Sequence, residues 1–146
     1  MKDVPSINQI QDDIIEEFAA YDDWMDKYSY LIELGNDLAP YPEEHRTQQN
    51  VIEGCQSTVW INAELQPDGT IAFDGDSDAI IVKGIVALLI RVLGGHTPSE
   101  IVDAELYFIR QIGLEEHLTP TRSNGLLAMV RQMRLYAVAF KSIENK

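Results

Sequence analysis

The chain has 146 residues, of which 45% are hydrophobic and 24% are charged, a balance typical of one globular domain with its own hydrophobic core. Its 24 acidic and 11 basic residues give a formal net charge of −13, which disfavours nucleic acid and anionic membrane surfaces as partners. No stretch has the length and apolar composition of a transmembrane helix, and the first residues lack the apolar run of a signal peptide. Together with an unpaired cysteine, these features predict a cytoplasmic protein.

Two amphipathic helices are expected at the start of the chain. Ser6 stands as an N-cap with Gln9 three residues later, and apolar residues then recur at helical spacing, namely Ile7, Ile10, Ile14 and Phe18. Asp22 and Asp23 favour the start of a second helix, because acidic side chains in a first turn suit the helix dipole. A polar, irregular connection over residues 40–50 is expected to follow it.

A period of two replaces the helical pattern after residue 58. Alternating apolar residues over 59–65 predict a strand with one buried face, and residues 70–73 return as its antiparallel partner after a turn. Residues 51–52 favour a further short strand. The sheet is therefore expected to have about three strands.

The rest of the chain is expected to be helical. Residues 74–78 lead into the most apolar helix, which ends at residues 94–95. Thr97 as a cap, with Glu100 three residues later, marks the start of a shorter helix or helix pair that Gly113 closes. Residues 120–124 begin a last helix. No repeat or linker divides the chain, so the sequence predicts an α+β fold in a single domain over residues 1–146, with the small antiparallel sheet packed against several helices.

Cys55 is the only cysteine of the chain. A single thiol excludes an intrachain disulfide, a redox cycle with a resolving thiol in the same chain, and an all-cysteine metal or cluster site built by one chain. Gly54 would let another backbone approach the sulfur, and Gln56 and Ser57 supply polar groups beside it. Two roles remain for Cys55: a thiolate that receives a group and passes it on, or an inert buried thiol.

Two other patterns suggest chemistry at first sight. Asp74, Asp76 and Asp78 have the spacing of a calcium loop, but the glycine and the final glutamate of that loop are missing, and capping of the next helix accounts for Asp78. No metal is therefore predicted. A histidine could act as a base for Cys55, which leaves a Cys-dependent hydrolase or acyl transferase as an alternative function; the candidates are His45, His96 and His117.

The segment over residues 122–125 has two interpretations that stay open. Ser123 or Asn124 could cap the last helix, whereas Gly125 weakens a helix at that position. Arg122 stands where a buried or partner-facing positive charge could be held.

Four separated segments, over residues 54–60, 76–84, 95–101 and 113–126, occur in the order found in the SufE family of sulfur acceptors, and the chain resembles that family from about residue 8 to residue 140. The resemblance implies an α+β fold shared with scaffold proteins of the IscU type, and it makes Cys55 the sulfur acceptor. It implies that further residues lie near the acceptor loop or contact the partner: Gly54, Gln56, Ser57, Asp76, Asp78, Arg122 and Asn124. If Arg122 lies near the sulfur, its fixed positive charge would favour the thiolate of Cys55.

The implied partner is a cysteine desulfurase of the SufS or CsdA type, which carries pyridoxal phosphate and holds sulfur as a persulfide. A protein of this family takes that sulfur onto its own cysteine, stimulates the desulfurase and delivers the sulfur to a scaffold for iron–sulfur cluster assembly. This chain is then expected to need no cofactor or metal of its own. It is expected to act as a sulfur-transfer partner rather than as an enzyme working alone. A cluster scaffold needs several soft ligands, which one cysteine cannot supply, so a carrier is favoured over a scaffold.

Overall fold

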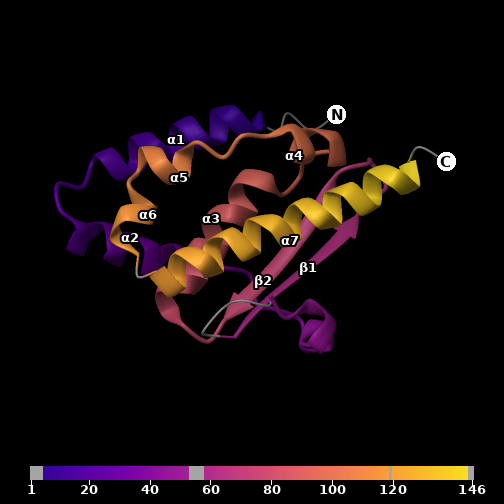
Figure 1. Ribbon diagram of the computed structural model, residues 1–146, viewed down its shortest axis with the longest axis horizontal. Helices are drawn as coiled ribbons and strands as arrows, with labels where there is room; N and C mark the ends of the chain where they lie inside the picture. The colour runs from indigo at the N-terminus through magenta and orange to yellow at the C-terminus, as the bar shows by residue number, and fades with distance from the viewer. Residues whose placement is uncertain (1–4, 53–57, 119, 145–146) are drawn as a thin grey trace.

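The computed structural model describes residues 5–52, 58–118 and 120–144, and it has an α+β architecture (Figure 1). Helices α1 and α2 precede two 3-10 turns and a hairpin, and five further helices follow the hairpin. The elements are α1 (Ile7–Ala19), α2 (Trp24–Asn36), η1 (Glu43–His45), η2 (Gln48–Asn50), β1 (Val59–Leu65), β2 (Ile71–Ser77), α3 (Ile80–Leu93), α4 (Pro98–Asp103), α5 (Phe108–Gln111), α6 (Leu114–His117) and α7 (Pro120–Glu144).

The helix starts that the sequence predicts are confirmed where a side chain caps them. Ser6 accepts a hydrogen bond from the Gln9 N–H, and Asp23 caps α2 through the Asp26 N–H. At α4 a complete capping box forms, in which Thr97 and Glu100 bond each other's backbone N–H groups.

The sheet consists of β1 and β2, paired antiparallel from Val59 opposite Ser77 to Leu65 opposite Ile71. The expected third strand is reduced to an isolated bridge between Val51 and Trp60. The second strand ends four residues later than the sequence indicated, since residues 74–77 continue it instead of forming a lead-in to α3. The sequence shows no alternation of apolar and polar residues over 74–77, because this segment consists of two aspartates, a glycine and a serine.

Gly75 explains why the strand can continue through this segment. It is buried on the face of the sheet that α3 covers, and a Cβ at that position would lie 2.6 Å from Cγ1 of Val86. Such a distance is far below van der Waals contact. The missing side chain therefore lets the strand approach the helix.

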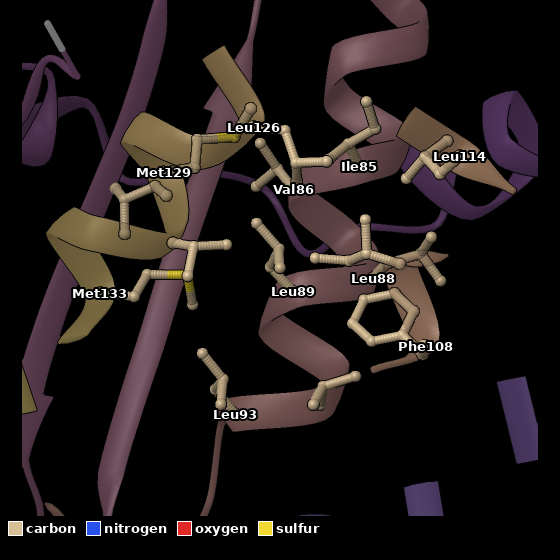
Figure 2. Close-up of a cluster of buried hydrophobic side chains, with 14 of the residues drawn as sticks. Ile85, Val86, Leu88, Leu89, Leu93, Phe108, Leu114, Leu126, Met129 and Met133 are labelled. Atoms are coloured by element: carbon tan, nitrogen blue, oxygen red, sulfur yellow. The ribbon is translucent and has the colours of Figure 1, made fainter. Parts of the chain in front are cut away.

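Helix α3 lies at the centre of the hydrophobic core, as Figure 2 shows. One side of α3 presents Val86 and Leu89 to a stripe of α7 that contains Leu126, Met129 and Met133. The other side packs against Phe108 and Leu114 of the short helices. All of these side chains are at most 1% exposed. Among the described residues, none of the helices has the length and apolar composition that a bilayer crossing requires.

Helices α2 and α3 approach each other through two glycines. A Cβ on Gly84 would lie 2.2 Å from the carbonyl oxygen of Leu31, and a Cβ on Gly35 would lie 2.8 Å from the backbone nitrogen of Gly84. The helix backbones are therefore in direct contact, which fixes α3 and the end of β2 that leads into it.

Candidate functional site

The candidate site is the end of the sheet where β1 begins and β2 ends. Gly54, Cys55, Gln56 and Ser57 lie outside the described residues, but the residues on both sides of them are described. On the N-terminal side, the Ile52 N–H donates a hydrogen bond of 2.9 Å to the Val59 carbonyl. Thr58 follows on the C-terminal side. We call Ile52 and Thr58 the anchored ends.

Thr58 is held by three hydrogen bonds from the junction between β2 and α3. Its N–H donates to Oδ1 of Asp78 at 3.0 Å, and its carbonyl accepts from the Asp78 N–H at 3.2 Å. Ser77 Oγ also donates to the Thr58 carbonyl at 2.9 Å. With these partners the position of Thr58 is defined on both its donor and its acceptor side.

The sequence-based explanation of Asp78 as a helix cap is wrong. The N-cap of α3 is Ala79 and makes no side-chain cap, while the Asp78 carboxylate accepts the Thr58 N–H instead. Ser77 Oγ accepts the Ala79 N–H. Ser77, which sequence reasoning did not single out, is buried and serves both Thr58 and the start of α3. Its isolated hydroxyl carries no sequence signal of that role.

Asp76 joins this end of the sheet to two basic residues. Its carboxylate lies 2.6 Å from Nη2 of Arg46 and 3.4 Å from Nζ of Lys83, and it accepts the Ser77 N–H at 2.8 Å. Burial acts to raise the pKa of Asp76, but the hydrogen bond from Arg46 and the contributions of Ser77 and Lys83 outweigh it. The pKa of this carboxyl is therefore lowered from its ordinary value of 3.8.

This lowered pKa makes the contribution of Asp76 to stability depend on pH. The contribution should be complete above the ordinary value and should be lost as the pH falls through the lower pKa of the folded state. At neutral pH, Asp76→Asn is expected to reduce the free energy of unfolding by about 2 kcal/mol, because charge-assisted hydrogen bonds are lost from a partly buried group.

Urea unfolding at a series of acidic pH values would measure the difference in the free energy of unfolding between the wild type and Asp76→Asn. It should shrink towards zero below pH 3.8. Glu44→Gln, which changes an exposed acid in the same part of the chain, should show little difference at any pH. A difference for Asp76→Asn that stayed constant down to the lowest pH would contradict the role given to its charge.

Arg46 was not identified from the sequence, because residues 40–50 have no periodicity. Its guanidinium lies 4.7 Å from the ring centre of Trp60 and 5.2 Å from that of Tyr41, and Nε lies 3.2 Å from Glu43. Together with the ion pair to Asp76, these contacts hold the connection over residues 40–50 against the outer face of the sheet. The chain entering the site from its N-terminal side is thereby held.

Arg122 and Asn124 are exposed in the first turns of α7. The helix begins at Pro120, so neither Ser123 nor Asn124 is its N-cap; Ser123 Oγ instead lies 3.4 Å from the Glu115 carbonyl. Figure 2 shows the early part of α7 facing the early part of α3. Figure 1 shows the start of α7 at the end of the molecule where β1 begins and β2 ends. The structure thus brings Arg122 and Asn124 to the end that holds the two aspartates.

The three histidines contact other residues. His96 pairs with Ile71, the first residue of β2, and so lies about 20 Å along the strand from its last residue. His117 stacks on Trp24 with ring centres 4.0 Å apart. His45 lies beside a carboxylate on the outer face of the sheet. Within the described part of the chain, none of the three has a hydrogen bond or ion pair to the anchored ends, and a Cys–His pair gains no support from them.

Comparison with known proteins agrees with this fold. The family model for SufE, described as an Fe-S metabolism associated domain, matches residues 12–137. The chain is also similar to a solved structure from Thermus thermophilus, the solution structure of a hypothetical protein, with a TM-score of 0.75 and 22% sequence identity. That likeness covers 91% of this chain and 96% of the other, and it supports the shared fold. The chain belongs to the SufE family, whose domain is associated with iron–sulfur metabolism.

Proposed function

We propose that the protein accepts sulfur from a cysteine desulfurase of the SufS or CsdA type on Cys55, stimulates that enzyme, and passes the sulfur to a cluster assembly scaffold in the cytoplasm. The observation that carries the proposal is the SufE match over residues 12–137, which contains the only cysteine of the chain. The desulfurase would supply pyridoxal phosphate, and the chemistry proposed here needs no cofactor from this chain.

The transfer step balances without a further reactant. The Cys55 thiolate attacks the outer sulfur of the donor persulfide, a new S–S bond forms on Cys55, and the donor cysteine leaves as a thiolate. Such an exchange requires thiolate character and access rather than an acid–base pair. This requirement fits a site in which none of the described histidines has a hydrogen bond or ion pair to the anchored ends.

The anchored ends limit where that step can take place. Three residues of chain span at most about 11 Å, so connectivity alone keeps Cys55 within that reach of Ile52 and of Thr58. The exposed side chains described at this end of the molecule include Asp78, Ile80, Arg122 and Asn124. We infer that these residues contact the desulfurase, with Ile80 adding an apolar contact that sequence reasoning did not identify; its side chain is 60% exposed.

Mass spectrometry of the intact protein tests the proposal. After incubation with desulfurase and free cysteine, Cys55 should carry one additional sulfur atom. An activated ester in place of the desulfurase should leave no acyl group on Cys55. An acyl adduct without a sulfur adduct would replace the sulfur carrier by the Cys-dependent hydrolase or acyl transferase.

Removal of the Asp78 carboxylate should expose the thiol. We propose that Cys55 is shielded in the free protein and becomes accessible when the desulfurase binds. Asp78→Ala deletes the acceptor of the Thr58 N–H and should raise the alkylation rate of Cys55 several-fold, with a loss of about 1 kcal/mol in the free energy of unfolding.

Alkylation of the folded protein, followed by mass spectrometry, measures this rate. Glu64→Ala, an exposed change at the other end of β1, is the control and should leave the rate unchanged. Desulfurase added to the wild type should also raise the rate. Shielding is ruled out if alkylation is equally fast in the free protein, in the complex and in Asp78→Ala.

Arg122 is proposed to favour the thiolate form of Cys55 by its positive charge. Arg122→Ala should therefore raise the pKa of the Cys55 thiol, which the ultraviolet absorbance of the thiolate reports as a function of pH. Arg131→Ala, a charge loss further along the same helix, is the matched control and should leave that pKa unchanged. An unchanged thiol pKa in Arg122→Ala would remove this role.

A further inference from the structure

Helix α7 differs in charge from the rest of the molecule. It contains four of the 11 basic residues of the chain and one of the 24 acidic ones, so the helix is positive although the protein carries −13. The basic residues are Arg122, Arg131, Arg134 and Lys141. At physiological ionic strength the Debye length is about 8 Å, so a partner that touches α7 senses this local charge more than the distant acidic surfaces.

Two of the basic residues of α7 have no acidic partner within the described part of the molecule. Ion pairs there engage Arg46, Lys83 and Arg91, whereas none of them involves Arg131 or Lys141. The chain has about twice as many acidic as basic residues, yet the positive charges of Arg131 and Lys141 are not neutralised by ion pairs within its described part. These charges are therefore available to another molecule.

Exposed apolar side chains accompany these charges. Leu127, Leu135 and Val138 are each more than half exposed, and Arg131 lies between them at helical spacing. The four residues therefore form one stripe on the side of α7 that faces away from the core. We call this stripe, together with Arg134, the α7 outer face. Figure 1 shows α7 running across the molecule along this length.

A groove of about 380 Å³ continues the α7 outer face towards α5. Its apolar lining comes from Leu106 and Ile109 on one side and from Leu127 and Val130 on the other. Arg110 and Arg134 line it as well, and carboxylates contribute at Glu105 and Glu115.

Not all of the hydrogen-bond donors of Arg134 have acceptors within the described part of the protein. One of its terminal nitrogens donates to the Ala104 carbonyl at 2.7 Å, which holds the side chain against the groove. Its Nε is buried and has no hydrogen-bond partner among the described residues. A carboxylate placed in the groove would meet the charge of this guanidinium, which lines the groove.

We propose that the α7 outer face and its groove dock a protein partner that presents apolar side chains flanked by carboxylates. The apolar side chains enter the groove beside Leu127, and the carboxylates meet Arg131 and Arg134. An amphipathic acidic helix has this arrangement, with anchors spaced by three and four residues. The proposal does not depend on the sulfur chemistry of Cys55. A groove suits a shaped protein segment better than the flat surface of an anionic membrane.

Two labelled synthetic peptides of equal length test the proposal with the full chain. One has leucines at helical spacing with glutamates at the remaining positions, and the other has lysines in place of the glutamates. Fluorescence anisotropy at physiological salt measures both affinities. The glutamate peptide should bind, more weakly as salt increases, and the lysine peptide should not bind to the α7 outer face.

Four variants locate the binding site. Leu127→Glu and Arg131→Glu should each weaken binding of the glutamate peptide about tenfold or more, since each removes a central contact and adds a repulsive charge. Met25→Glu and Lys27→Glu make matched charge changes on α2 and should bind like the wild type. Loss of binding in the controls to the same extent would overturn the proposal, because the effect would then follow net charge alone.

Other occupants give different results. Binding of the protein to vesicles of equal parts phosphatidylcholine and phosphatidylglycerol, without binding to the glutamate peptide, would replace the protein partner by a lipid surface. Sedimentation equilibrium of the protein alone would reveal a second copy as the occupant, if the wild type is a dimer and Arg131→Glu a monomer. The absence of any peptide binding also rejects the proposal.

Discussion

Cys55→Ser is expected to abolish the gain of sulfur in the desulfurase reaction. A hydroxyl cannot form the S–S bond that the proposed transfer creates, and the chain has no second cysteine that could replace the lost thiol. The loss should therefore be complete in the mass spectrum, rather than partial as for a residue that only assists. Desulfurase turnover in the presence of the variant should fall to the level of the enzyme alone.

The same variant should keep its fold and its contact with the desulfurase, because serine differs from cysteine by one atom. Thermal unfolding and a binding measurement on Cys55→Ser are the controls that separate chemistry from docking. Wild-type stimulation of the desulfurase by Cys55→Ser would mean that Cys55 is structural, and the carrier function would have to be abandoned.

Gly84→Ala is expected to lower the free energy of unfolding by about 3 kcal/mol or more, although alanine normally strengthens a helix. The added methyl would lie 2.2 Å from the Leu31 carbonyl oxygen, and a backbone atom cannot rotate away. Helices α2 and α3 would have to separate. Urea unfolding of the wild type and the variant measures the loss.

A comparison of two rescue experiments tests this explanation. Leu31→Ala should not restore Gly84→Ala, since the obstacle at Leu31 is mainly its carbonyl group. In Gly75→Ala the nearest atom is Cγ1 of Val86, a side-chain atom, so Val86→Ala should restore part of the lost stability there. Equal rescue in both pairs would show that the backbone contact between α2 and α3 is not the cause.

The sequence predicted the helices well, because their signals are local. Ser6, Asp23 and Thr97 stand directly before apolar repeats, and each caps the helix that follows. The α+β class followed from the change of period at residue 59 and is confirmed. The length of β2 did not follow, because the burial of Gly75 and Ser77 depends on α3, and no local pattern reports a tertiary contact.

The contacts at the candidate site could not be predicted from the sequence. The resemblance to the SufE family implied that Asp76 and Asp78 lie near the acceptor loop or contact the partner, but it named no hydrogen-bond or ion-pair partner for either side chain. Their partners are Arg46, which is 30 residues from Asp76, and Thr58, which is 20 residues from Asp78. Contacts between residues so far apart in the sequence are determined by the fold. A single sequence has no local pattern from which they can be predicted.

The attachment of Thr58 to the start of α3 makes the stability of the protein largely independent of the segment that carries Cys55. Hydrogen bonds on both sides hold the anchored ends independently of the five residues between them. The entropy of closing a loop changes by only about 0.6 kcal/mol when its length doubles. A change in the length or sequence of the segment that carries the thiol is therefore expected to alter the free energy of unfolding little, so this segment could be adapted to a new sulfur donor without destabilising the protein.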